Sequence, residues 1–219
     1  MPLRPFLAAV LLAMLSAVPA TALPASANLV APPAAGSPAD AADRAAVAAV
    51  FTPARIALAG RDAGYDPFIA FGSVLGDAFA RDALPATRRI LGALQFAVDR
   101  AMIEAKGLFP RSRPYAVEAS LHRCGGTRFL AEDRSYPSGH ATVGQAWGIV
   151  LAALVPQRSA ALLARGLDYG TSRVVCGLHW PSDVAAGQAI GAAMAADFLA
   201  DPAMARLLRR AAEELAPFG

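Results

Sequence analysis

Two of the three histidines in the sequence stand in one stretch, from Ser135 to Asp183, and each has neighbours suited to holding an oxyanion. His140 ends the run Ser-Tyr-Pro-Ser-Gly-His, which has the character of a helix start. The N-terminus of a helix attracts anions through its free N–H groups and its dipole. His179 is followed by Trp-Pro-Ser-Asp, and a neutral imidazole with one free nitrogen is a nucleophile. The stretch therefore indicates chemistry on a phosphate or a related oxyanion.

Three basic residues could supply the positive charge that such an oxyanion requires. Lys106 is the only lysine in the chain, and Arg113 follows it after six intervening residues. Arg173 precedes His179 by five intervening residues. Metal-free cleavage of a phosphate monoester needs donors for the nonbridging oxygens, a nucleophile, a proton donor and a group that orients the nucleophile. Taken singly, these residues could be surface charges or helix caps, but together they favour a phosphate or vanadate site.

The order and spacing of these residues resemble the signature of the type 2 phosphatidic acid phosphatase superfamily. The matching positions are Lys106, Arg113-Pro114, Pro137-Ser138-Gly139-His140, Ser172-Arg173, His179 and Asp183. The flanking residues, from about Leu84 to Gly187, are similar to the class A bacterial non-specific acid phosphatases. The resemblance implies a secreted enzyme that forms a single globular all-α domain, the helical bundle shared by acid phosphatases and vanadium haloperoxidases.

The resemblance also implies a role for each matching residue. His179 is the nucleophile that forms a phosphohistidine, and Asp183 accepts a hydrogen bond from its other ring nitrogen. His140 is the general acid for the leaving alkoxide and later the base that activates water. The residues implied to hold the phosphoryl oxygens are Lys106, Arg113, Ser138, Gly139 and Arg173, with the N–H groups of the serine and the glycine contributing at a helix start. The resemblance implies no metal and no cofactor.

Further residues near these motifs have less definite interpretations. His122 and Arg123 could touch the substrate or could be exposed loop residues. Arg111 and Arg128 could raise the positive potential around the site or could be solvated.

Two aromatic residues and two cysteines also stand near the motifs. Trp180 is interpreted as a core residue, and Tyr136 could line the pocket. Cys124 and Cys176 are the only cysteines and are predicted to form a disulfide, since the chain has features of an exported protein. The alternative is a pair of free buried thiols, and no spacing of cysteine and histidine resembles a zinc site.

The N-terminal residues have the features of a targeting segment. Arg4 precedes an apolar run, and Ala20-Thr21-Ala22 fits a small-residue cleavage site, so residues 1–22 are predicted to be a signal peptide. A membrane anchor is the alternative. Residues 23–37 are rich in proline and alanine and are predicted to be a flexible leader, followed by a phosphatase domain over 38–219. We therefore expect a periplasmic or secreted protein with no stable membrane insertion after cleavage.

The rest of the chain is predicted to be helical. Proline follows a capping residue at Pro38, Pro53, Pro67 and Pro202, which marks helix starts. Further helices are expected over 85–105, 138–154 and 159–175 and from Pro181, with residues 107–135 mostly irregular. The expected apolar contacts of the stretches 85–105 and 159–175 are Ile90, Leu91, Leu94, Phe96, Ala97, Ala101, Met102, Leu162, Leu163, Leu167 and Tyr169. Small residues after Val184 would let another helix approach closely.

These patterns lead to one expected function and several alternatives. We expect a metal-independent acid phosphatase that hydrolyses small phosphate monoesters, with highest activity at mildly acid pH because His140 must hold its proton. The alternatives are a lipid phosphate or diphosphate phosphatase, a vanadium haloperoxidase and a non-enzymatic phosphate-binding protein. The formal net charge of +3 is scattered along the chain, so no binding of nucleic-acid polymers is expected. The chain could assemble as a homo-oligomer.

Overall fold

The computed structural model describes residues 29–121, 123–124 and 130–219. The predicted signal peptide, residues 23–28 of the predicted leader, His122 and Arg128 lie outside the described residues. The regular structure of the described part is helical and contains no sheet, which confirms the predicted all-α class. The α-helices are α1 (Pro38–Val47), α2 (Pro53–Arg61), α3 (Pro67–Leu75), α4 (Pro85–Leu108), α5 (Pro114–Val117), α6 (Gly139–Leu154), α7 (Ser159–Val175), α8 (Pro181–Ala200) and α9 (Ala205–Leu215).

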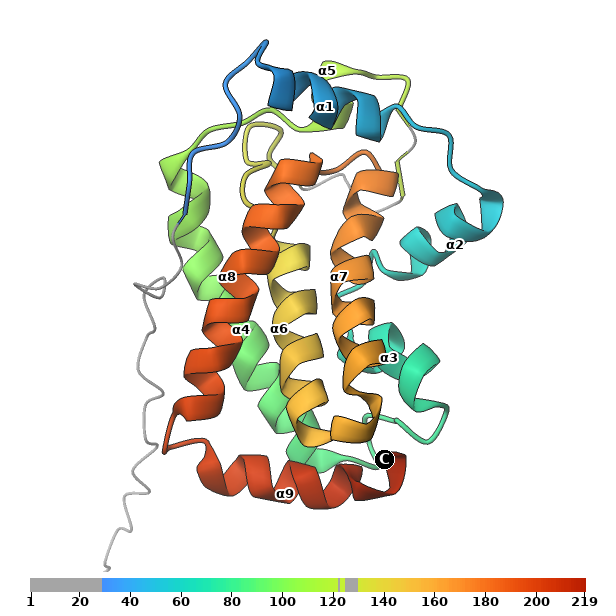
Figure 1. Ribbon diagram of the computed structural model, residues 1–219, viewed down its shortest axis with the longest axis vertical. Coiled ribbons are helices and arrows are strands. Elements are labelled where there is room, and N and C mark those ends of the chain that lie inside the picture. The colour runs from blue at the N-terminus through green and yellow to red at the C-terminus, as the bar shows by residue number, and fades with distance from the viewer. Residues whose placement is uncertain (1–28, 122, 125–129) are drawn as a thin grey trace, which may run out of the picture.

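Four long helices, α4, α6, α7 and α8, lie side by side along the length of the molecule (Figure 1). The α9 helix crosses one end of this bundle, and α1 and α5 lie at the other end. Successive long helices alternate in direction, so the C-terminal ends of α4 and α7 meet the N-terminal ends of α6 and α8 opposite α9. This arrangement gathers the four chain segments that carry the sequence motifs.

The predicted helix starts depend on local capping chemistry. The side chains of Ser37, Thr52 and Asp66 accept hydrogen bonds from backbone N–H groups in the first turns of α1, α2 and α3, each of which begins with proline. These three predicted starts and the start at Pro181 are confirmed. The last helix begins at Ala205 rather than at Pro202, because Asp201 accepts from the N–H groups of Ala203 and Met204 in a preceding turn.

Small residues allow α8 to approach α6 closely, as predicted. A Cβ atom added at Gly187 would lie 2.4 Å from the carbonyl oxygen of Ser138, and one added at Gly191 would lie 2.2 Å from that of Thr142. No side chain fits at these distances. The contact therefore holds the start of α6 firmly against α8, and both of these helices carry site residues.

The core lies where α4, α6, α7 and α9 face one another, around Trp147 and Tyr169. Three predicted core residues are exposed: the exposed fraction is 61% for Phe96, 37% for Leu163 and 44% for Leu167. Phe96 follows the buried Leu94 by two positions, which turns its side chain toward the opposite face of α4. The interpretation of these three residues as core contacts was therefore wrong.

The segment between α4 and α6 is mostly irregular, as expected, and its two ends are hydrogen bonded to each other. The N–H of Arg111 donates to the carbonyl of Asp133 at 2.8 Å, and the N–H of Ser135 donates to the carbonyl of Arg111 at 3.0 Å. These two bonds lay the chain after α4 beside the residues that precede α6. The upstream basic residues are thereby brought to the start of α6.

Candidate active site

The ends of α4, α6, α7 and α8 place the sequence motifs together. Lys106 lies in the last turn of α4, His140 in the first turn of α6 and Arg173 in the last turn of α7. His179 precedes α8, and Asp183 lies in the first turn of that helix. The N–H of Ser138, the N-cap of α6, donates to the carbonyl of Asp183 at 3.0 Å and joins the two helix starts.

His179 and Asp183 form a buried pair with His179 Nδ1 3.4 Å from Asp183 Oδ2. Burial lowers the pKa of His179 to about 3, with a further contribution from the charge of Lys106. Burial alone would raise the pKa of Asp183, but the hydrogen bond from His179 and the contacts with Ser135 and Arg111 hold that pKa below its ordinary value. At neutral pH the pair is therefore a neutral imidazole beside a carboxylate.

The Nε2 atom of His179 lies 3.1 Å from Nη1 of Arg113. A guanidinium can only donate, so Nε2 accepts and the ring proton lies on Nδ1, facing Asp183. Arg113 is itself 3% exposed and donates to the backbone carbonyls of Ala131, Leu178 and Arg134 at 2.9 to 3.0 Å. These bonds fix the guanidinium beside the nitrogen that carries the free lone pair.

Arg173 is 4% exposed, and its Nε and Nη1 atoms have no hydrogen-bond partner among the described residues. Burial lowers the pKa of this arginine to about 10. A buried cation whose donors are unused is costly unless an anion can satisfy it. Arg173 thus has the properties expected of a residue that binds a phosphoryl oxygen.

Lys106 reaches the same region from α4. Its Nζ atom donates to the carbonyls of Pro137 at 2.6 Å, Arg134 at 3.0 Å and Ser135 at 3.5 Å. Burial, followed by the charge of Arg113, lowers the pKa of Lys106 to about 7. Lys106 would therefore lose its charge near neutral pH.

His140 lies between two tyrosine rings. Its ring makes an edge contact with Tyr65, with centroids 4.3 Å apart, and stacks on Tyr169 at 5.7 Å. Its Nε2 atom lies 3.3 Å from the carbonyl oxygen of Ala63, which can only accept, so Nε2 carries a proton. Burial and the nearby charge of Arg173 lower the pKa of His140 well below its ordinary value.

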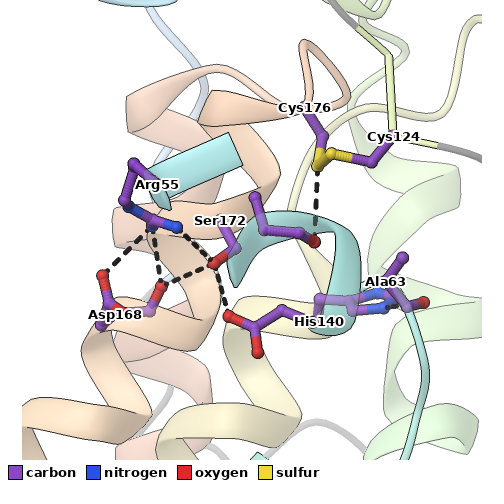
Figure 2. Close-up of a disulfide and its surroundings, with 9 residues drawn as sticks. Arg55, Ala63, Cys124, His140, Asp168, Ser172 and Cys176 are labelled. Atoms are coloured by element: carbon purple, nitrogen blue, oxygen red, sulfur yellow. Dashed lines mark hydrogen bonds and ion pairs between the residues drawn. A yellow bond between two sulfur atoms is a disulfide. The ribbon is translucent and has the colours of Figure 1, made fainter. Parts of the chain in front are cut away.

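The carbonyl that contacts His140 is held in place by a buried polar network that sequence reasoning did not find. Asp62, the residue between the end of α2 and Ala63, pairs with Arg165 of α7 and accepts from Ser172 Oγ at 2.5 Å. Figure 2 shows Ser172 also meeting Arg55 of α2, which donates to it at 3.0 Å. Ser172 of the Ser-Arg motif therefore fixes α2. Its partners Arg55 and Asp62 lie more than 100 residues from the motif in the sequence, and no sequence signal relates them to it.

The helix start at Ser138 differs in one respect from the expectation. Ser138 is buried, its Oγ accepts from the N–H of Ala141 at 3.4 Å, and its own N–H is used by Asp183. The expectation that the N–H of Ser138 faces an anion was therefore wrong. Gly139, at the first position of α6, lies beside Tyr65, whose hydroxyl would be 3.2 Å from an added Cβ.

Cys124 and Cys176 form the predicted disulfide, with 52 residues of sequence separation (Figure 2).

Trp180 is buried as predicted, and its Nε1 donates to the carbonyl of Ser112 at 2.8 Å. The Tyr136 hydroxyl donates to the carbonyl of Val30, so part of the predicted leader contacts the residues before α6. Arg123 lies over the ring of Tyr115 at 5.5 Å from its centroid.

Arg111 is the main site residue whose position the sequence left open. It is not solvated: its side chain is 10% exposed and forms ion pairs with Asp183 at 2.6 Å and Asp43 at 2.8 Å. It lies two residues before Arg113, and its closeness to the motif was the only signal in the sequence. Within the residues that the structure describes, no group of three or more histidine, cysteine or acidic side chains is arranged to hold a metal ion.

Comparison with known proteins agrees with this geometry. The family model described as "PAP2 superfamily" matches residues 90–206, a region that contains every predicted site residue from Lys106 to Asp183. The chain belongs to the PAP2 superfamily. This confirms the family that the motifs indicated.

The chain is also similar to several phosphatases. It is 39% identical over 116 residues to the non-specific acid phosphatase of Salmonella typhimurium, covering 52% of the chain and 46% of that protein. It is 32% identical over 167 residues to the non-specific acid phosphatase of Providencia stuartii, covering 72% of the chain and 67% of that protein. A lipid A 1-phosphatase of Rhizobium johnstonii is 45% identical over 58 residues, which is 26% of the chain and 24% of that protein. The chain thus spans about half the length of the Salmonella relative.

Proposed function

We propose that the protein is a metal-independent acid phosphatase that hydrolyses small phosphate monoesters through a phosphohistidine at His179. The observation that carries this proposal is the environment of His179, whose Nδ1 faces the carboxylate of Asp183 while Nε2 lies 3.1 Å from the guanidinium of Arg113. A phosphate held by that guanidinium would have its phosphorus next to the free lone pair. The acid phosphatases of Salmonella and Providencia support the same reaction class.

Phosphate binding would use three cations that arrive from three segments. Arg113 lies beside His179, Arg173 has two unused buried donors, and Lys106 donates to the loop before α6. Forked guanidinium donors match the geometry of phosphoryl oxygens, and the ammonium adds a point charge. Their preorganised charge would stabilise the negative charge that is spread over the oxygens in the transition state.

The reaction would proceed in two displacements. In the first, the Nε2 lone pair of His179 attacks phosphorus, the bond to the leaving oxygen breaks, and His140 gives that oxygen a proton. In the second, His140 removes a proton from water, the hydroxide oxygen attacks phosphorus, and the phosphorus–nitrogen bond breaks to release inorganic phosphate. Asp183 stabilises the positive charge on the imidazole during both steps.

The lowered pKa of His140 has a direct consequence for this scheme. Burial and Arg173 disfavour its protonated form, but a bound phosphate would offset the charge of Arg173 and favour protonation. We therefore propose that the substrate itself brings His140 into its acid form. This effect would place the highest activity at mildly acid pH.

The test is hydrolysis of p-nitrophenyl phosphate by the purified protein with and without EDTA and vanadate. We expect EDTA to have no effect and vanadate to inhibit. His179→Ala should abolish turnover, and full activity in that variant would exclude His179 as the nucleophile. His140→Asn should impair alkyl phosphates far more than p-nitrophenyl phosphate, because a nitrophenolate leaves without protonation.

A lipid phosphate phosphatase is the second candidate, favoured by the identity of 45% over 58 residues with the Rhizobium lipid A 1-phosphatase. Among residues 29–121, 123–124 and 130–219, no helix has the length and hydropathy needed to cross a membrane. Turnover of phosphatidate in detergent micelles should be compared with turnover of a soluble monoester. A higher kcat/KM for phosphatidate would favour the lipid phosphatase.

The location of the protein is proposed on the same grounds. The disulfide between Cys124 and Cys176 is typical of an extracytoplasmic protein. We propose export to the periplasm or the medium, directed by residues 1–22. N-terminal sequencing of the exported protein would test this, and a mature protein that begins at Met1 would contradict it.

A further inference from the structure

Arg111 connects the carboxylate that orients His179 with the N-terminal helix α1. Its Nη1 atom lies 2.6 Å from Asp183 Oδ1 and 2.7 Å from Ser182 Oγ, and its Nη2 atom lies 2.8 Å from Asp43 Oδ2. Asp183 is fully buried, Asp43 is 4% exposed and the Arg111 side chain is 10% exposed. The guanidinium therefore forms a buried bridge between Asp183 and α1, which also brings Asp40 Oδ1 to 3.9 Å from Nη2.

Asp43 holds both the guanidinium of Arg111 and the residue next to Asp183. Besides accepting from Arg111, its Oδ1 atom accepts from the N–H of Ser182 at 3.0 Å, and its Oδ2 atom accepts from the hydroxyl of Ser182. Ser182 is the residue before Asp183 in the first turn of α8. One carboxylate from α1 thus holds the guanidinium and the helix turn that carries the orienting aspartate.

The backbone of Arg111 holds Ser135, which donates a hydrogen bond to the second oxygen of Asp183. The carbonyl of Arg111 accepts from the N–H of Ser135 at 3.0 Å, and the hydroxyl of Ser135 donates to Asp183 Oδ2 at 2.5 Å. The same oxygen accepts from the N–H of Trp180 at 2.9 Å. Arg111 therefore contacts one oxygen of Asp183 directly and supports a donor to the other.

We propose that Arg111 and Asp43 are positioning residues for the nucleophile, and that through them α1 sets the rate at which His179 is phosphorylated. The inference rests on the proposed function. A carboxylate held at both oxygens has one orientation in which it can accept the Nδ1–H of His179. Without Arg111 the buried Asp183 would lack its only cationic hydrogen-bond donor among the described residues and could turn toward Ser182. His179 would then lose the ring orientation that directs Nε2 at phosphorus.

The experiment measures phosphorylation of His179 by rapid quench, together with steady-state kinetics, for Arg111→Gln, Arg111→Lys and Asp43→Asn. Loss of a hydrogen-bonded partner that orients a metal-bound histidine typically costs about 10- to 100-fold, and by analogy we expect a loss of that order in kcat/KM for Arg111→Gln. Asp43→Asn should lose about tenfold, since the amide keeps an acceptor for Ser182 but loses its charge. Arg111→Lys should recover part of the rate, because the ammonium retains the charge but not the fork.

Competitive inhibition by sulfate separates positioning from phosphate binding. Arg113, Arg173 and Lys106 are intact in these variants, so the inhibition constant for sulfate should stay within about twofold of the wild-type value. The proposal would be overturned if the variants are less stable to heat but phosphorylate His179 at the wild-type rate per folded molecule. Arg111 and Asp43 would then have only a structural role. The near-isosteric Asp43→Asn keeps this comparison valid if Arg111→Gln does not fold.

Arg44→Gln is the matched control. Arg44 also lies on α1, pairs with Asp40 at 3.0 Å and sits over Trp180 at 5.4 Å from the ring centroid, close to the 5.5 Å of Arg111. It has no contact with Asp183, and its partner Asp40 lies 3.9 Å from Arg111, farther than the 2.8 Å of Asp43, so its kinetics should match the wild type. An equal loss of rate in Arg44→Gln would show a general effect of α1 and contradict the proposal. Absence of phosphohistidine in the wild-type protein would instead overturn the proposed function and this inference with it.

Discussion

Two buried arginines on α7 should respond in opposite directions to the same substitution. Arg165 and Arg173 are 8% and 4% exposed. Arg165 donates through Nε to the carbonyl of Ala70 at 2.8 Å and pairs with Asp62, whereas Nε and Nη1 of Arg173 have no partner among the described residues. Arg165→Met should therefore destabilise the protein, and Arg173→Met should stabilise it in the absence of ligand.

The expected magnitudes follow from burial. Each unsatisfied buried donor costs about 1–3 kcal/mol, so replacing Arg173 with an apolar side chain should raise the free energy of unfolding by about 2 kcal/mol. This corresponds to a rise in Tm of roughly 4–8 °C for a protein of this size. Arg165→Met leaves Asp62 as a buried charge without its cation and should lower the free energy of unfolding by about 3–5 kcal/mol.

The assay is urea unfolding followed by far-UV circular dichroism, with and without phosphate. Phosphate at roughly 100 times its dissociation constant should stabilise the wild type by about 2.7 kcal/mol. Arg173→Met should lose most of this effect, whereas Arg165→Met should keep it if the variant folds. Two results would refute the assignment of Arg173 as an anion-binding residue. One is that Arg173→Met destabilises the protein as much as Arg165→Met does, and the other is that phosphate stabilises Arg173→Met as much as the wild type.

Three further predictions concern charge, covalent linkage and packing. Lys106 has a pKa of about 7, lowered from its ordinary value by burial, so it carries charge below that pH and loses it above. Inhibition by sulfate, whose own charge is constant in this range, should weaken as pH rises from 6 to about 8, and Lys106→Arg should remove that dependence. Reduction of the Cys124–Cys176 disulfide, with its separation of 52 residues, should lower the free energy of unfolding by about 4 kcal/mol in a denaturant titration, and an unchanged midpoint would contradict this. Gly191→Ala should lower the free energy of unfolding by about 1–3 kcal/mol, because the new Cβ would lie 2.2 Å from the carbonyl oxygen of Thr142. Gly92→Ala should raise it by up to about 1 kcal/mol, because no atom lies within 4 Å of the new Cβ.

The sequence by itself determined the helix starts and the identity of the chemical groups. Capping by Ser37, Thr52 and Asp66 is a local interaction that extends over three residues or fewer, so composition predicts it well. The spacing from His179 to Asp183 is also local and predicts their contact. The disulfide followed from there being only two cysteines to pair.

The tertiary structure decided which side chains support those groups. Asp43 lies 139 residues from Ser182, and Asp62 lies 110 residues from Ser172, and each pair is hydrogen bonded only because α1 and α2 pack against the bundle. The N–H of Ser138 is used by Asp183 only because α6 and α8 meet at glycines. Side-chain charge and spacing carry no information about such long-range partners, since many pairings of aspartate with arginine are equally compatible with one sequence. The chemistry of the site was therefore readable from the motifs, whereas its positioning depends on contacts between distant helices.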